Sequence, residues 1–157
     1  PEILDHFERA GCVELNHGRL LFSSERYRAY CAGAWLSLYA RDALLNAVGT
    51  QRLWAIKNDL QVELPHPHSI CREIPMTAMV NSHLVFIFCV SSHREDLETL
   101  RGESLLLRVH FSAKVFWLSL DHLDERLLTR LQQDEISVCQ GLELKELSQR
   151  FETYFTR

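Results

Sequence analysis

The sequence lacks the features that mark membrane and secreted proteins. Its longest uninterrupted apolar run covers residues 84–90, which is far too short to span a bilayer. No positively charged start followed by an apolar stretch indicates a signal peptide. There is also no internal repeat and no linker-like stretch. We therefore expect a cytoplasmic protein with no membrane partner.

Cysteine pairs are missing as well. The five cysteines are odd in number and widely spaced, and no C-x-x-C occurs. This pattern indicates neither a zinc ribbon nor a disulfide scaffold. Reduced thiols in a cytosolic protein are the simplest expectation.

Common catalytic motifs are also absent. The sequence has no phosphate-binding or dinucleotide-binding glycine loop, no H-E-x-x-H and no G-x-S-x-G. His66 and His68 are two residues apart and could begin a metal site. Pro65 and Pro67 flank them, which favours a polar surface loop.

What is present is a chain of globular composition. It has 157 residues, of which 46% are hydrophobic and 24% charged, enough for one domain with a sizeable core. Because 17 basic and 21 acidic residues give a net charge of -4, general binding of polyanions is not expected. Nucleic acid would need a local basic patch. The candidates are Arg26, Arg28, Arg41, Arg52 and Lys57, and a solvated helix face is the alternative.

Apolar periodicity predicts strands that alternate with helices. The run 84–90 has no polar face, so it belongs in the centre of a sheet that is covered on both sides. Other strands are expected at 53–64, 70–80, 114–120 and 136–139. Helices are expected at 2–10, from Ser23 or Ser24 to Gly49, from Ser92 to Gly102, after Asp121, and at 142–155.

The fold class expected from this order is α/β, with a central mixed sheet flanked by helices. A hairpin that turns at residues 16–18 follows the first helix, which is the layout of a winged-helix fragment. Trp35, Trp54 and Trp117 have apolar neighbours in the sequence and are predicted to lie in the core. Because the chain opens with Pro1, we expect it to be a piece of a longer protein.

Three stretches carry a likeness to a known family. Residues 24–36 (SERYRAYCAGAWL) resemble a helix that ends in G-x-W-L-E, and residues 72–89 resemble a hairpin N-E-L-D-V that leads into I-E-C-K. Residues 97–101 (LETLR), the strand near Phe116 and residues 141–147 (GLELKEL) resemble the closing elements. Together they are similar to the C-terminal half of CARF–nuclease effectors of type III CRISPR systems.

The resemblance implies two regions and an antiviral role. Residues 1–23 would be the winged-helix-like helix and hairpin, and residues 24–157 a restriction-endonuclease-like (PD-(D/E)XK) domain. In that family a CARF domain senses cyclic oligoadenylate, and the nuclease domain cuts nucleic acid with a divalent metal. The partners implied are a CARF or active nuclease domain elsewhere in the protein or complex, DNA or RNA, and a second copy in a homodimer.

The catalytic residues of the family are replaced in this chain. The aspartate position is Pro75, the glutamate and lysine positions are Phe88 and Val90, and the glutamate after W-L is Ser37. A divalent ion beside these side chains would lack its carboxylate ligands. The resemblance therefore implies a pseudo-nuclease with no catalytic residues and no cofactor, acting as a scaffold or positioning nucleic acid.

Two alternatives stay open. The first is an active nuclease that uses Mg²⁺ or Mn²⁺ and relocated ligands, for which Glu73, Asp59 and Glu63 are the candidates. The second is a protein-interaction module with no relation to nucleases.

Overall fold

A computed structural model describes residues 7–17, 19–24, 35–64, 70–90 and 96–156. The chain divides into two compact units, Pro1–Leu38 and Tyr39–Arg157. The predicted boundary between residues 23 and 24 differs from this division and stays a prediction. No helix in the described ranges is long and apolar enough to cross a bilayer.

The first unit contains the predicted hairpin. Strands β1 (Val13–Asn16) and β2 (Arg19–Phe22) pair antiparallel, and Asn16 lies opposite Arg19. His17 in the turn has a positive φ of 48°, as two-residue hairpin turns require. The Ser23 hydroxyl donates a hydrogen bond to the Gly11 carbonyl at 2.7 Å and closes the open end of the hairpin.

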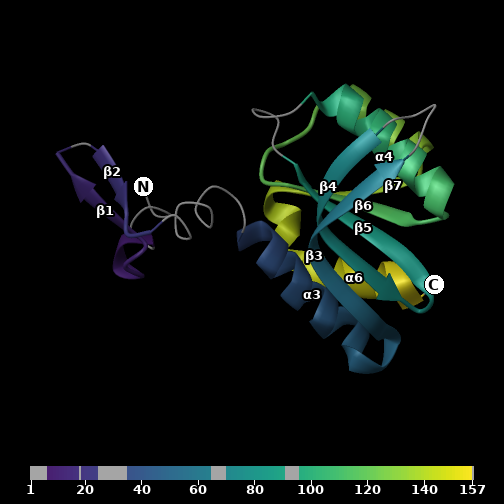
Figure 1. The fold of residues 1–157 in the computed structure, drawn as a ribbon, viewed down its shortest axis with the longest axis horizontal. Helices are drawn as coiled ribbons and strands as arrows, with labels where there is room; N and C mark the ends of the chain where they lie inside the picture. Colours follow the sequence, from purple (N-terminus) through teal and green to yellow (C-terminus); the bar gives the residue numbers. More distant parts are fainter. Residues whose placement is uncertain (1–6, 18, 25–34, 65–69, 91–95, 157) are drawn as a thin grey trace. The chain divides into compact units, whose positions relative to one another are not determined.

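The second unit is built on a five-stranded mixed sheet in the order β3-β4-β5-β6-β7 (Figure 1). Its strands are β3 (Leu53–Leu64), β4 (Ile70–Val80), β5 (His83–Val90), β6 (Lys114–Ser119) and β7 (Ile136–Gln140). The first three pair antiparallel, and β5, β6 and β7 pair parallel. The predicted fold class, α/β with a central mixed sheet flanked by helices, is confirmed.

Helices cover both faces of this sheet. The helical elements are α3 (Trp35–Arg52), α4 (Leu97–Phe111), α5 (Glu125–Gln133), the 3-10 helix η2 (Gly141–Glu146) and α6 (Leu147–Thr156). Figure 1 shows α4 on one side of the sheet, with α3 and α6 on the other. Helices α4 and α5 cover one face because they join parallel strands, which need a crossover.

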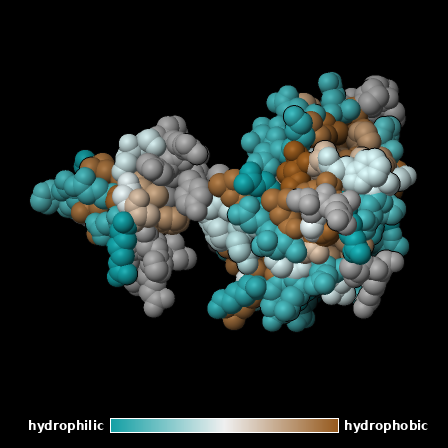
Figure 2. Space-filling view, turned by 90° about the horizontal axis from the view of Figure 1, so that it is seen from below, coloured by the Kyte–Doolittle hydropathy of each residue, from teal (hydrophilic) through white to brown (hydrophobic). Residues whose placement is uncertain are grey.

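Each face has its own apolar core. On the α4 side, residues of α4 and α5 such as Leu107 and Leu131 pack with Phe88 and Trp117 of the sheet. On the α6 side, the rings of Phe116 and Phe151 meet edge to face at 5.2 Å. Figure 2 shows one face of the unit, where a hydrophobic area is surrounded by hydrophilic side chains.

Two helix boundaries differ from the prediction. Helix α4 begins after Asp96, whose carboxylate accepts hydrogen bonds from the Thr99 hydroxyl and from the amides of Glu98 and Thr99. These bonds, with the Thr99 hydroxyl first, lower the pKa of Asp96. The helix then passes through Gly102, where an end was predicted, and stops at Ser112 in the left-handed conformation.

The N-cap of α5 was predicted too early. It is Asp124, not Asp121, since the Asp124 carboxylate accepts a hydrogen bond from the Arg126 amide at 2.8 Å. The long helix was predicted to end at Gly49; Gly49 has φ 65° and ψ 168° and kinks α3 there, and the element continues to Arg52.

Candidate active face of the central hairpin

The family's catalytic positions fall where the β4–β5 ladder ends. The last residue pair of this ladder is Met76–Ile87, and Pro75 and Phe88 occupy the next position. Proline has no N–H to donate, so the ladder cannot continue there. Pro75 and Phe88 therefore both follow the last pair of the same hairpin ladder.

Phe88 and Val90 are core residues. Their side chains are only 3% and 4% exposed, and both belong to the apolar cluster beneath α4 and α5. In the parallel register Phe88 lies beside Trp117, which is fully buried. These two side chains, at the positions where the resemblance implies a carboxylate and a lysine in an active nuclease, are therefore enclosed in hydrocarbon. Pro75 and Ser37 are half-buried.

A buried hydrogen bond fixes α4 over this face. The Trp117 indole N–H donates to the Ser104 hydroxyl at 3.0 Å, and both residues are fully buried. Removing the hydroxyl would leave the indole N–H without a partner, at a cost of ~1–3 kcal/mol. The bond therefore favours a single position of α4 against the strand that follows β5.

An ion pair that the sequence did not reveal joins α4 to β4. Arg72 Nε lies 3.3 Å from Glu103 Oε2, and the side chains are 28% and 23% exposed. Arg72 is opposite Val62 of the buried cluster, so the pair lies at the rim of that cluster. No sequence pattern connected these two residues, which are 31 positions apart.

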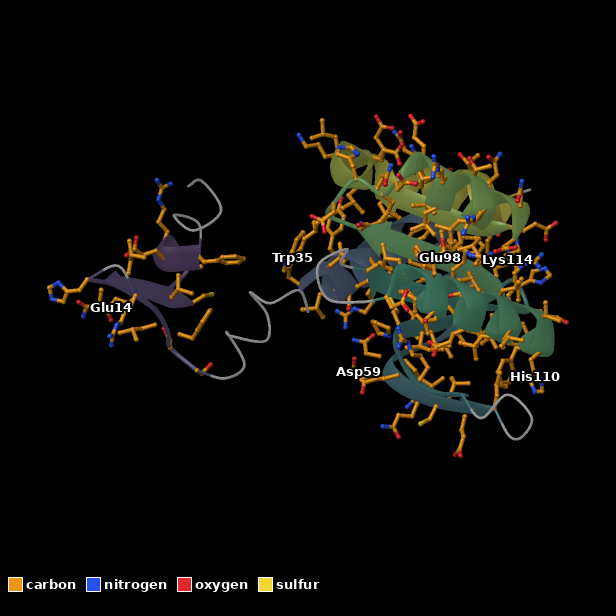
Figure 3. All side chains as sticks on the ribbon, turned by 90° about the horizontal axis from the view of Figure 1, so that it is seen from above. Glu14, Trp35, Asp59, Glu98, His110 and Lys114 are labelled. Carbon is orange, nitrogen blue, oxygen red and sulfur yellow. The ribbon has the colours of Figure 1, made fainter. Side chains whose placement is uncertain are left out.

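Asp59 lies across from the family's aspartate position. Between the pairs Asn58–Met76 and Leu60–Ile74, the unpaired position holds Asp59 on β3 and Pro75 on β4. Asp59 has a φ of 52° and an exposed side chain, on the outer strand in Figure 3. Aspartate tolerates this left-handed conformation better than most residues.

The other two relocated-ligand candidates lie further along the same two strands. Glu73 faces Gln61, and Glu63 faces Cys71, so both glutamates lie on the exposed face of the hairpin. Among the described residues, no three histidine, cysteine or acidic side chains come close enough together to hold a metal ion.

The candidate basic residues in the described parts lie on two elements, α3 and β3. Arg41 pairs with Asp42 at 3.5 Å on α3, whereas Arg52 ends that helix and Lys57 is exposed on β3. Arg26 and Arg28 lie outside the described residues, and so do His66 and His68.

A groove follows the open edge of β7, between α5 and α6. It is lined by apolar side chains such as Leu128 and Val138, and by the charged Lys114, Glu146 and Arg150. It contains Cys139, but burial raises the pKa of this thiol to about 11. The thiol is therefore protonated near neutral pH and is a poor nucleophile.

Solved structures share this architecture. No protein-family model and no curated protein sequence matches the chain. Protein VC1899 from Vibrio cholerae superposes with a TM-score of 0.81 at 20% identity, over 99% of this chain and 42% of its own. Can2 from Sulfobacillus thermosulfidooxidans, solved with cyclic tetra-adenylate, superposes with a TM-score of 0.78 at 13% identity. The chain has the fold of these proteins.

The match to Can2 covers 100% of this chain and 46% of Can2. The chain therefore spans less than half the length of either protein. At these identities the likeness establishes the fold alone.

Proposed function

We propose that this chain is a catalytically inactive, restriction-endonuclease-like domain of a CRISPR-associated effector that responds to cyclic oligoadenylate. Its role is to act as a scaffold or to position nucleic acid. The observation that carries this proposal is the burial of Phe88 and Val90 at the family's glutamate and lysine positions.

The chemistry of that face argues against metal-dependent cleavage. Mg²⁺ and Mn²⁺ bind through oxygen ligands, and the family uses carboxylates from both hairpin strands. Here the neighbouring side chains are proline, phenylalanine and valine, and α4 packs over the last two. An ion at this place would lose its hydration without gaining ligands.

The link to cyclic oligoadenylate rests on the fold. Can2, which was solved with cyclic tetra-adenylate, shares the fold across this entire chain. Because the chain corresponds to less than half of Can2, the CARF sensor or an active nuclease domain would be another part of the same protein or complex. A cytoplasmic location and a homodimer agree with this role.

The direct test is a cleavage assay. The chain is incubated with single- and double-stranded DNA and RNA, in Mg²⁺ or Mn²⁺, with EDTA as the control. We expect no cleavage above the EDTA background. Metal-dependent cleavage that disappears in Glu73→Ala would contradict the proposal.

One observation favours a second candidate, an active nuclease with relocated ligands. Asp59 lies opposite Pro75, and Glu73 and Glu63 follow on the same two strands. This candidate predicts that Asp59→Asn abolishes metal-dependent cleavage, whereas Glu125→Gln, at an exposed residue in the first turn of α5, leaves it unchanged. A protein-interaction module, by contrast, predicts no binding of nucleic acid even at low salt.

A further inference from the structure

The most exposed aromatic side chain of the described sheet is Trp54. Its apolar sequence neighbours predicted a core residue, and this prediction is wrong, because the side chain is 72% exposed. The cause is a shift in register. Leu53 pairs with Val80 and Ala55 with Met79, so Trp54 is the extra residue of a bulge. Bulges redirect a side chain and recur at functional sites.

Two cations accompany this indole. Arg52 precedes it by two residues at the end of α3, and Lys57 follows it by three on β3. Both side chains are exposed, and no salt bridge joins either of them to another described residue. By contrast, Arg101 and Arg130 on the helical face pair with acidic residues of α4 and the end of α5. Along a strand, three residues span about 10 Å, which is the backbone separation between Trp54 and Lys57.

Two chain segments that meet at this end of the sheet have no carboxylates. The segments Ala43–Asn58 and Ile74–Arg94 contain no aspartate or glutamate, although the whole chain has 21 acidic residues. These segments meet beside Trp54, since the Asn81 amide donates to the Arg52 carbonyl at 2.9 Å and Val80 pairs with His83. Although the chain has a net charge of -4, these two segments carry an exposed indole and cations but no acidic side chain.

We infer that this end of the sheet is a binding site for single-stranded nucleic acid. Trp54 stacks on an unpaired base, while Arg52 and Lys57 contact the adjacent phosphates. Aromatic stacking with basic contacts is the common way in which proteins hold single strands without sequence preference. The site lies where β5 begins, whereas Phe88 and Val90 lie where it ends.

This inference rests on the proposed role in positioning nucleic acid and gives that role a place on the molecule. An exposed tryptophan can also anchor a protein partner. The lack of carboxylates and the two cations favour a polyanion, since electrostatic attraction provides most of such binding. The local positive charge of Arg52 and Lys57 would allow binding here, although the net charge of the whole chain is negative.

The test is fluorescence anisotropy with labelled oligo(dT) and oligo(U) at low salt, using the 157-residue chain. Trp54→Ala is expected to weaken binding by about 5-fold to about 150-fold, which corresponds to the loss of one stacked base, and Trp54→Phe is expected to retain most of the affinity. Arg52→Ala and Lys57→Ala should each reduce the slope of log K against log salt by about 0.7. Duplex DNA should compete weakly, because its bases are already stacked.

Matched controls lie on η2. Leu142 is 74% exposed and Lys145 is exposed, so Leu142→Ala and Lys145→Ala remove similar surface groups away from the site and should leave the affinity unchanged. Thermal melts verify that each variant is folded. Because Trp54 is exposed, its replacement should not unfold the protein.

The other outcomes separate the two claims. If oligonucleotides bind and Trp54→Ala binds as the wild type does, the site inferred here is wrong, while the positioning role survives. If no oligonucleotide binds at low salt, the site at Trp54 and the proposed role in positioning nucleic acid are both wrong. If Trp54→Ala instead loses self-association in light scattering and keeps its oligonucleotide affinity, the surface is a protein interface and the inference is overturned.

Discussion

Placing a carboxylate back at the family's glutamate position tests the hydrophobic character of the face. Phe88→Glu removes a ring that is 3% exposed, and replacing such a ring with a small side chain costs ~3–5 kcal/mol. The new carboxyl would lie in the apolar cluster under α4, where burial raises a glutamate pKa by several units above its usual value of about 4.3. At pH 7 keeping it protonated costs roughly a further 3–4 kcal/mol. The sum approaches the whole stability of a domain, ~5–15 kcal/mol.

Phe88→Gln is the matched control, because the glutamine side chain has the shape of glutamate but no ionisable group. Urea denaturation of both variants is followed by tryptophan fluorescence between pH 4 and pH 8. When the pKa of a glutamate is raised in the folded state, the carboxyl group costs no ionisation energy below the unfolded pKa. Between the unfolded and the folded pKa, the free energy of unfolding falls as the pH rises. The free energy of unfolding of Phe88→Glu should therefore fall below that of Phe88→Gln by up to about 1.4 kcal/mol for each pH unit above pH 4.3.

The reasoning is refuted if the two variants have the same stability at every pH. It is also refuted if Mn²⁺ stabilises Phe88→Glu but not Phe88→Gln, since the face would then accept a metal ion once a carboxylate is present.

Three further predictions concern Ser104, two cysteines and Asp96. Ser104→Ala should lower the free energy of unfolding by ~1–3 kcal/mol because the Trp117 indole loses its partner, and in Ser104→Ala/Trp117→Phe the two effects should be non-additive in urea melts. Thiol labelling at pH 8 should modify the exposed Cys71 first and leave Cys139 unmodified in the folded protein, because burial raises the pKa of Cys139 to about 11; mass spectrometry after digestion checks this. Because the pKa of Asp96 is lowered in the folded state, its carboxylate stabilises the fold above the unfolded pKa near 3.8, and this stabilisation is lost as the pH falls through the folded pKa. Asp96→Ala should therefore have a lower melting temperature than the wild type at pH 7, and the difference in melting temperature should disappear in acid.

The strands were the most predictable part of the fold. The run 84–90 has no polar face, and such a run is stable only between two covered faces, so its place in the middle of the sheet followed from composition alone. The hairpin turn at His17 followed in the same way from two apolar runs around a two-residue turn.

Helix ends were less predictable because several residues compete as caps. Helix α4 continues through Gly102 because Leu100 and Leu107, seven residues apart, bury the same face of the helix. This packing outweighs the tendency of glycine to end a helix. A glycine inside a helix costs only about 1 kcal/mol. Asp121 and Asp124 are equivalent as capping residues in sequence, and only the hydrogen bonds distinguish them.

Trp54 could not be placed from sequence, because a bulge changes which way a side chain points without leaving a mark in the apolar pattern. The Arg72–Glu103 pair was also hidden, since two residues on different elements meet only through the packing of α4 on β4. By contrast, the place of Pro75 and Phe88 just past the last pair of the β4–β5 ladder follows from the register of one hairpin.

The central claim is that the family's metal-binding position is filled by hydrophobic core. The most direct measurement is a crystal structure of this chain soaked in Mn²⁺, with data collected at the manganese absorption edge. The account predicts no anomalous density within ligand distance of Pro75 or Phe88. An Mn²⁺ ion held beside Pro75 by the carboxylates of Asp59 and Glu73 would contradict it.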